Sequence, residues 1–199
     1  MPIIGLTGSL GTGKSTVAGM FAEHGAVIVD ADAINRDLLT LDKKCIKKVV
    51  KSFPSVILEL NQIDRSKLAN IVFQNPRELK KLTSILYPEA LKQVKRQISK
   101  YRKQNKLIVL DVPLLFESGW DCLADTTIVV KALREQQITR VRERMGLTKA
   151  QIGQRLKLQI PLKEKCHMAD IIINNGGTIN QTRKQVSAVI HKLMQRKVN

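Results

Sequence analysis

Short apolar runs, separated by longer amphipathic and polar stretches, form the main pattern of this chain. The first run leads into a glycine-rich turn, and the residues from Thr16 to Glu23 follow with helical character and end near Gly25. Apolar runs of this length, separated by helices, predict the strands of a parallel, doubly wound sheet. We expect five strands, at Ile3–Thr7, Ala26–Val29, Leu107–Val112, Thr126–Val130 and Ile171–Ile173.

The region between the second and third strands has a different pattern and contains no expected strand. Apolar residues recur three and four positions apart, which predicts amphipathic helices. Lysines fill the other positions of the first helix, and such a run is usually a solvated face. We therefore expect a helical insertion over residues 33–105. Its apolar positions are Ile46, Val49, Val50 and Phe53 in one helix and Leu91, Val94, Ile98 and Tyr101 in a longer one.

The remaining sequence predicts an arginine-rich segment and two more helices. Arginines cluster between Arg134 and Arg144, and a helix is expected to begin at Thr148 with Gln151 as its capping-box partner. The run of Asn and Gly over 174–177 predicts a turn after the last strand. Val186, Ile190 and Leu193 then provide the apolar stripe of a terminal helix.

The excess of basic over acidic residues favours negatively charged partners. The chain of 199 residues has 34 Lys and Arg against 17 Asp and Glu, which gives a formal charge of +17 and a field that attracts polyanions. Aromatic residues are scarce, with one Trp, two Tyr and four Phe, so a stacking surface for single-stranded nucleic acid is poorly supported. We expect no specific nucleic acid partner, and a phosphorylated small substrate fits the charge equally well.

The cysteines and the first residues bear on the compartment. Cys45, Cys122 and Cys166 are scattered and form no CxxC pair, which indicates a reducing environment. Cys166 beside His167 has no second pair at metal-ligand spacing, so a thiol is favoured over a zinc site. The opening run shows neither a signal peptide nor a membrane span. We expect a cytoplasmic protein without a membrane partner, as a monomer or weak homo-oligomer.

The turn after the first strand carries the clearest chemistry. Gly8-Ser9-Leu10-Gly11-Thr12-Gly13-Lys14-Ser15 matches GxxxxGK[ST] and lies between an expected strand and an expected helix. Glycines let successive backbone N–H groups turn toward one anion, and the helix dipole adds partial positive charge. Lys14 can then reach the β- and γ-phosphates of ATP, and the Ser15 hydroxyl can bind Mg²⁺. A GTPase, a mechanical ATPase and a small-molecule kinase all remain possible at this point.

Two carboxylates at the end of the second strand favour a kinase. In an open parallel sheet, ligands bind beyond the carboxyl ends of the strands, where Asp30-Ala31-Asp32 is expected. If the chain stays extended, Asp30 and Asp32 point to the same side. One of them can accept a hydroxyl proton, and the other can serve as a helix N-cap. Asp111 lies near the end of the third strand as a Walker-B carboxylate would, able to hold Mg²⁺ directly or through water.

Several further strings, in order along nearly the whole chain, resemble dephospho-coenzyme A kinases. Asp-Ala-Asp combined with Pro-Leu-Leu-Phe-Glu is the most specific part of the resemblance. Three short departures occur: Ser9-Leu10 replaces Gly-Ile, Tyr87-Pro88 replaces His-Pro, and Ser52-Phe53-Pro54 replaces a Phe-Gly element. The matching strings are the glycine-rich loop, Val29–Asp32, Asp64-Arg65, Asp111–Glu117, Gln137 with Arg140 and Arg144, and Ala169-Asp170 with Asn174 and Gly176.

This resemblance implies an α/β fold of the P-loop NTPase type with three parts. These are a nucleotide-binding core (1–32, 106–133 and 166–199), a helical coenzyme A subdomain (33–105) and an arginine-rich lid (134–165). It implies ATP and Mg²⁺ as cofactors, dephospho-coenzyme A as the acceptor, and Asp32, Lys14 and Arg140 as catalytic residues. The implied nucleotide contacts are Gly8, Gly11, Thr12, Gly13, Lys14, Ser15, Thr16, Arg140, Arg144 and Asn174. The implied acceptor contacts are Asp30, Asp32, Arg65, Pro113, Leu114 and Glu117, and the implied metal ligands are Ser15 and Asp111.

Two other functions stay open on the sequence. One is a nucleoside or nucleoside-monophosphate kinase, which would use the same core and lid. The other is a basic P-loop protein that binds nucleic acid or acts as a regulatory switch. The absence of an Asn-Lys-x-Asp string, which reads guanine in GTPases, counts against a GTPase switch.

Overall fold

The computed structural model describes residues 1–57 and 62–195. It divides into two compact units, unit 1 with Met1–Val29 and Lys100–Asn199, and unit 2 with Asp30–Ser99. Each unit is described by itself. The three-part division into core, helical subdomain and lid stays a prediction.

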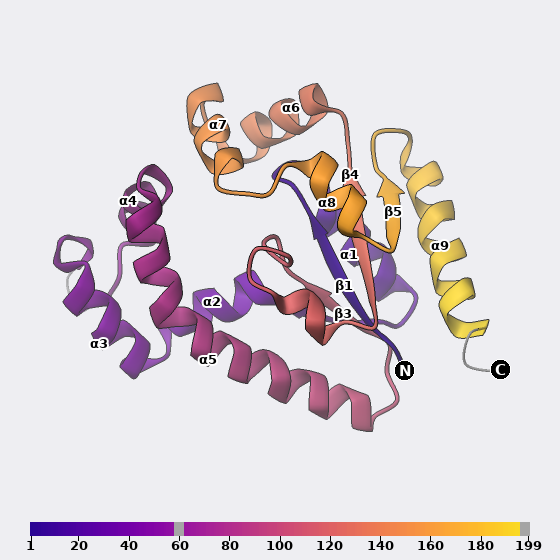
Figure 1. The fold of residues 1–199 in the computed structure, drawn as a ribbon, viewed down its shortest axis with the longest axis horizontal. Coiled ribbons are helices and arrows are strands. Elements are labelled where there is room, and N and C mark those ends of the chain that lie inside the picture. Colours follow the sequence, from indigo (N-terminus) through magenta and orange to yellow (C-terminus); the bar gives the residue numbers. More distant parts are fainter. Residues whose placement is uncertain (58–61, 196–199) are drawn as a thin grey trace. The chain divides into compact units, whose positions relative to one another are not determined.

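Unit 1 is built on the parallel five-stranded sheet that the apolar runs predict, which confirms the expected fold class. The strand order is β2-β3-β1-β4-β5 (Figure 1). The central strand is fixed in register by its neighbours, since Leu6 pairs with Asp111 on one side and with Ile128 on the other. The strands are β1 (Ile3–Gly8), β2 (Val27–Asp30), β3 (Ile108–Asp111), β4 (Thr126–Lys131) and β5 (Ile171–Asn174).

Helices α1 (Lys14–Glu23) and α9 (Ile179–Gln195) cover one face of the sheet. Strand side chains alternate between faces, so every second residue of β1 and β4 meets these helices. Figure 1 shows α9 alongside β5, the strand at the edge of the sheet. The resulting core contains Ile4, Leu6, Val17, Phe21, Val109, Ile128, Val130, Ile173, Val186 and Leu193.

The strand order directs ligands to the loops after β1 and β4. These two strands are neighbours, but the chain runs from β1 to β2 at one edge and from β4 to β5 at the other. A crevice forms where connections diverge in this way. Three helices follow in unit 1, and Figure 1 shows the first two above the carboxyl ends of the strands. They are α6 (Arg134–Met145), α7 (Lys149–Lys157) and α8 (Leu162–Met168).

The predicted capping box at the start of α7 is confirmed. The Thr148 hydroxyl accepts a hydrogen bond from the Gln151 backbone N–H, and the Gln151 side-chain oxygen accepts one from the Thr148 N–H at 2.9 Å. This reciprocal pairing satisfies two amides that would otherwise lack a partner at the helix start.

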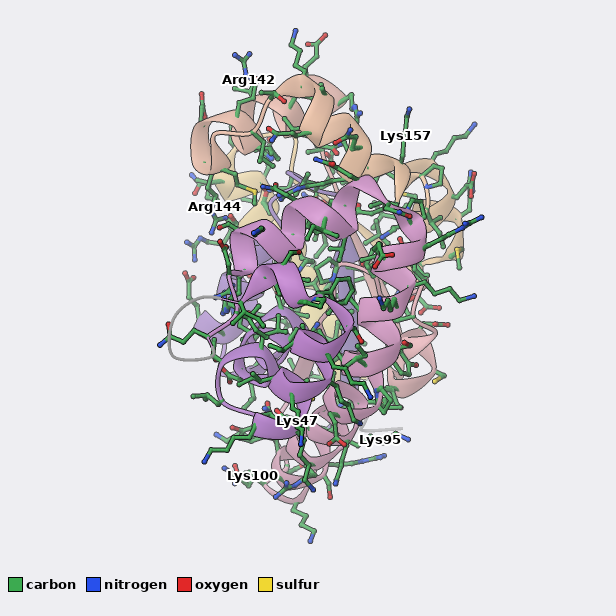
Figure 2. The ribbon with its side chains drawn as sticks, turned by 90° about the vertical axis from the view of Figure 1, so that its left-hand side faces the viewer. Lys47, Lys95, Lys100, Arg142, Arg144 and Lys157 are labelled. Atoms are coloured by element: carbon green, nitrogen blue, oxygen red, sulfur yellow. The ribbon has the colours of Figure 1, made fainter. Side chains whose placement is uncertain are left out.

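Unit 2 is helical, with an isolated bridge between Ile57 and Ile63 as its β pairing among the described residues. Val49 is buried as expected, and so is Cys45, which the predicted apolar face of its helix did not include. Lys47 and Lys95 are exposed and carry the charge outward (Figure 2). The elements are α2 (Ala31–Thr40), α3 (Lys43–Ser52), η1 (Pro54–Val56), α4 (Arg65–Gln74) and α5 (Pro76–Lys103), which continues into unit 1.

None of the helices in the described ranges is long and apolar enough to cross a membrane. Even α5, the longest, is amphipathic, with a buried line and basic residues on its other sides. The buried line consists of Leu82, Leu86, Ala90, Val94 and Ile98.

Candidate functional site

The glycine-rich loop, Gly8–Ser15 (the P-loop), needs glycine at two positions because other elements approach its backbone closely. Gly11 and Gly13 have φ angles of 81° and 85°, a region that residues with a Cβ rarely adopt. A Cβ on Gly11 would clash with the carbonyl oxygen of Gln137 on α6, and one on Gly13 would clash with the side chain of Asn175. The loop is therefore shaped by α6 and by the turn after β5.

Helix α1 begins at Lys14 without a side-chain cap and without an acidic residue in its first turn. The first amides of a helix lack partners within it, and its dipole favours an anion there. The amides of Thr12 and Thr16 already bond inside the loop, to the carbonyls of Ser9 (3.2 Å) and Gly13 (3.0 Å). The Thr12 side chain is buried and donates to the Ser9 carbonyl at 2.9 Å. An anion bound here would thus meet a loop that is held in shape by internal bonds.

Lys14 forms an ion pair with Asp111, the last residue of β3. Both side chains are largely buried, with 14% and 7% of their surface exposed. Ser15 follows Lys14 and is exposed. A hydroxyl and a carboxylate oxygen are suitable Mg²⁺ ligands, and this metal typically takes its other ligands from phosphates and water. The described residues contain no cluster of three or more His, Cys, Asp or Glu side chains that could hold a metal alone.

Arg140 reaches the P-loop from α6. Its guanidinium group donates to the backbone carbonyls of Asn175 (3.1 Å) and Thr12 (3.5 Å). Arg140 therefore lies beside the P-loop, and its contact with a nucleotide stays a prediction. Arg144, one turn later, is exposed, and Figure 2 shows its side chain extending outward from α6, as does that of Arg142. The two arginines lie four residues apart on α6 and share a helical face, as predicted, but only Arg140 is partly buried.

Asn175 is a site residue that the sequence analysis missed. It is buried, its side-chain amide donates to the Thr12 carbonyl at 2.9 Å, and its side-chain oxygen accepts from Thr182 at 3.0 Å. The predicted residue, Asn174, is exposed and accepts from the Gly176 amide within the turn. Alternation along β5 could have identified Asn175, because it follows the buried Ile173 by two positions.

Residues Pro113–Glu117 include three of the implied acceptor contacts and are called the acceptor wall from here on. They are held by side chains that no motif indicated. The Pro113 carbonyl accepts from the Thr7 hydroxyl at 3.0 Å and from the Lys165 ammonium group at 2.8 Å. Lys165 also pairs with Glu117 at 2.8 Å, and the same Glu117 oxygen accepts from the Ile160 amide at 2.9 Å. Leu114 is half-buried, and its carbonyl accepts from the Ser118 amide.

Lys165 is wholly buried, which is unusual for a lysine. Burial lowers the pKa of its ammonium group, the bond and charge of Glu117 oppose that shift, and the charge of Lys14 adds to it. Burial also lowers the pKa of Arg155 on α7. Burial therefore acts in the same direction on both cations and disfavours their charged forms.

In unit 2, Asp30 serves as the N-cap of α2, and its carboxylate accepts from the amides of Asp32 (2.8 Å) and Ala33 (3.0 Å). The chain is helical from Ala31, so alternation along an extended chain no longer places both carboxylates on one side. Asp32 is exposed in the first turn. Arg65 is exposed at the start of α4, where Asp64 is the N-cap.

Comparison with known proteins identifies the family. A sequence model of dephospho-CoA kinases matches residues 2–181. The dephospho-CoA kinase of Carboxydothermus hydrogenoformans is 41% identical over 194 residues, which cover 96% of this chain and 94% of that protein. The dephospho-CoA kinase of Geobacillus kaustophilus is 40% identical over 94% of each chain.

Solved structures agree with this assignment. A Thermus thermophilus protein matches with a TM-score of 0.82 and 32% identity, over 96% of this chain and 97% of its own. The dephospho-CoA kinase from Campylobacter jejuni matches with a TM-score of 0.72 and 28% identity, over 98% of each chain. The suspected resemblance is confirmed: the chain belongs to the dephospho-CoA kinase family.

Proposed function

We propose that this chain transfers the γ-phosphate of ATP to the ribose 3′-hydroxyl of dephospho-coenzyme A. The observation that carries the proposal is the P-loop lysine, Lys14, paired with Asp111 at the carboxyl ends of adjacent strands, in a chain of this kinase family. A nucleoside or nucleoside-monophosphate kinase would share the loop, but the relatives at about 40% identity are dephospho-CoA kinases over nearly their whole length.

At the phosphate end, the P-loop amides and Lys14 would bind the triphosphate, and the contacts at Gly8, Gly11, Gly13 and Thr16 remain proposals. Arg140 would donate to the transferred group from α6. Its guanidinium group is half-buried and preorganised by two carbonyls, so little freedom is lost when it bonds a phosphate oxygen. Ser15 and Asp111 would hold Mg²⁺, which would supply positive charge to neutralise the phosphates during transfer.

At the acceptor end, we assign Asp32 as the general base. Asp30 carries the helix cap through its own carboxylate, so the two acidic residues have different tasks. In the step, the 3′-oxygen forms a bond to the γ-phosphorus and its proton passes to Asp32. The bond from the γ-phosphorus to the bridging oxygen breaks, and ADP leaves with that electron pair. Arg65 and the acceptor wall would position the substrate.

We further propose that residues 134–165 act as a lid, with Arg144 joining the nucleotide when it closes. Basic groups must leave the phosphates before product can exit, and lids of this kind often limit turnover. Amide hydrogen exchange over Gly146–Leu158 should slow when a non-hydrolysable ATP analogue and acceptor are added together. Unchanged exchange in this segment would contradict the lid.

The function itself can be tested by product analysis. The protein is incubated with ATP, Mg²⁺ and dephospho-coenzyme A, and mass spectrometry should show one phosphoryl group added to the ribose. Parallel reactions with nucleosides and nucleoside monophosphates should give no product, and Lys14→Ala serves as the matched inactive control. A transfer that prefers a nucleoside monophosphate would refute the assignment. Binding to a random DNA duplex should vanish at moderate salt, as expected for a charge effect alone.

A further inference from the structure

We propose that Lys165 is a positioning residue of this kinase, which holds the acceptor wall Pro113–Glu117 in the shape that dephospho-coenzyme A binding requires. The proposal rests on the proposed function, because that function makes this segment a wall of the acceptor site. Lys165 donates to the Pro113 carbonyl and to the Glu117 carboxylate, each at 2.8 Å. One ammonium group therefore bonds both ends of the wall.

The complete burial of Lys165 indicates that its hydrogen bonds, rather than its contribution to stability, explain its presence. None of its side chain is exposed, so the ammonium group has lost its hydration, and its long side chain has lost its rotamer freedom. A buried ion pair seldom stabilises a protein more than well-packed apolar residues of similar size. Methionine would fill the same space without that cost. The lysine does, however, supply two hydrogen bonds that methionine lacks.

The Pro113 carbonyl is fixed from two directions. Thr7, which is wholly buried on β1 just before the P-loop, donates to it at 3.0 Å, and Lys165 donates from α8. The neighbouring Val112 amide donates to the Leu6 carbonyl at 3.0 Å. The chain leaving β3 is thus tied to β1 on one side and to α8 on the other, so its direction after Asp111 is determined by these bonds.

The segment from Asp111 to Glu117 carries a carboxylate at each end, and each pairs with a lysine from another element. Lys14 forms an ion pair with Asp111 on the nucleotide side, and Lys165 forms one with Glu117 on the proposed acceptor side. The two ammonium groups are close enough for the charge of Lys14 to lower the pKa of Lys165. Loss of Lys165 should therefore loosen one end of this segment and leave the Lys14 pair in place.

The proposal predicts a selective defect in Lys165→Met. We expect the KM for dephospho-coenzyme A to rise about tenfold or more, because misplacement of a wall is felt by the substrate that it contacts. The Kd for ATP, measured by calorimetry, should stay within about twofold, and the binding stoichiometry in the same titration reports the folded fraction. The matched control is Lys184→Met, an exposed lysine on α9 and outside the proposed lid, which should leave both constants unchanged.

A second pair of variants covers the case that Lys165→Met does not fold. Thr7→Val removes the other donor to the Pro113 carbonyl, and Thr7→Ser keeps it. Thr7→Val should show the same rise in the KM for dephospho-coenzyme A. Thr7→Ser should keep the KM of the original protein. A purely structural role would lower the folded fraction without this split between acceptor and ATP.

The outcomes separate this proposal from the proposed function. The positioning role is overturned if the KM for dephospho-coenzyme A is unchanged in folded Lys165→Met and Thr7→Val. It is also overturned if this KM and the Kd for ATP rise in equal proportion. An unsubstituted protein that neither phosphorylates nor binds dephospho-coenzyme A overturns the function and this proposal with it. A selective rise in acceptor KM, rescued by serine, supports both.

Discussion

The polar side chains of the two units bond in different ways. In unit 1, site residues bond across long stretches of chain: Lys14 pairs with Asp111, and Asn175 bonds Thr12, at sequence separations of 97 and 163. In unit 2, acidic side chains bond backbone amides two or three residues away. These local acceptors are Asp30, Asp42 and Asp64.

This difference separates two kinds of polar residue. A long-range bond exists only when the whole unit has folded, so the phosphate end of the site is preorganised by tertiary structure. A cap bond belongs to one helix end and survives rearrangement of its neighbours. Asp32 and Arg65 are exposed, which suits groups that meet a substrate. Substitutions should therefore have large effects on catalysis in the first class and small, local effects in the caps.

The largest effect is expected from Lys14→Ala. Turnover should fall by about 10³- to 10⁵-fold, which is what a cation on a transferred phosphoryl group can contribute. Asp111 would also lose its partner while largely buried, so the free energy of unfolding should decrease. Steady-state turnover and denaturant unfolding measure the two effects, with the exposed Lys184→Ala as control. Turnover near that of the control would overturn the role of Lys14.

Asp32→Asn should come next. The change keeps the shape of the side chain and removes the proton acceptor, so turnover should fall by about 10²- to 10⁴-fold while the Kd for ATP changes little. Asp30→Asn is the matched variant, because asparagine is an equally good N-cap. Its turnover should fall much less than that of Asp32→Asn. Turnover of Asp32→Asn within a few-fold of the original would show that it is not the base. A lost ATP affinity would reassign it to the metal.

Asn175→Ala tests whether the buried network shapes the P-loop. The variant loses the bonds to the Thr12 carbonyl and the Thr182 hydroxyl, so we expect kcat/KM for ATP to fall about 10- to 100-fold, as for supporting residues of other sites. Asn174→Ala, one residue earlier and exposed, should stay within about threefold. Equal losses in the two variants would mean that Asn174 contacts the nucleotide, as the sequence suggested.

The strands and the P-loop could be predicted from sequence because their signals are local. An apolar run between turn residues identifies a strand, and each expected strand end lies within one residue of the observed end. The Thr148 and Gln151 capping box is equally local, since both partners lie within one helical turn. Lys14 and Ser15 follow from a motif whose spacing reflects one loop geometry.

The partners of these residues could not be predicted in the same way. Lysine is almost never buried, so nothing in the sequence distinguished Lys165 from the exposed lysines around it. Asn175 and Asn174 are identical in type, so the motif alone did not separate them; alternation from the buried Ile173 favours Asn175, and its burial shows that it is the one that reaches the P-loop. The sequence allows Asp30 to be either an N-cap or a site residue. The start of the helix right after β2 depends on the packing of the buried Ala31, Ile34 and Leu38, which is a tertiary effect.

The pH dependence of stability offers a smaller test of the buried lysine. Because burial lowers the pKa of Lys165, the native state releases this proton at lower pH than the unfolded state. The unfolded state then binds more protons between the two pKa values, and stability rises with pH across that window. Methionine does not titrate. The free energy of unfolding of the original protein minus that of Lys165→Met (the gap) should therefore increase as pH rises toward the ordinary lysine range. Urea unfolding at paired pH values measures the gap, and a gap that narrows would mean that the Glu117 pair outweighs burial.

The smallest effect is expected from removing a cap in unit 2. The Asp42 carboxylate accepts from the Cys45 amide at 2.8 Å at the start of α3, and Asp42→Ala should cost about 1 kcal/mol of stability. Because the bond is local, the loss should appear as faster hydrogen exchange in α3, with exchange in β1 and β4 unchanged. Asp42→Asn keeps the cap and removes the charge, so it should restore most of the protection. Protection lost equally in both units would show that the cap supports the whole molecule, and the contrast between long-range and local polar groups would then fail.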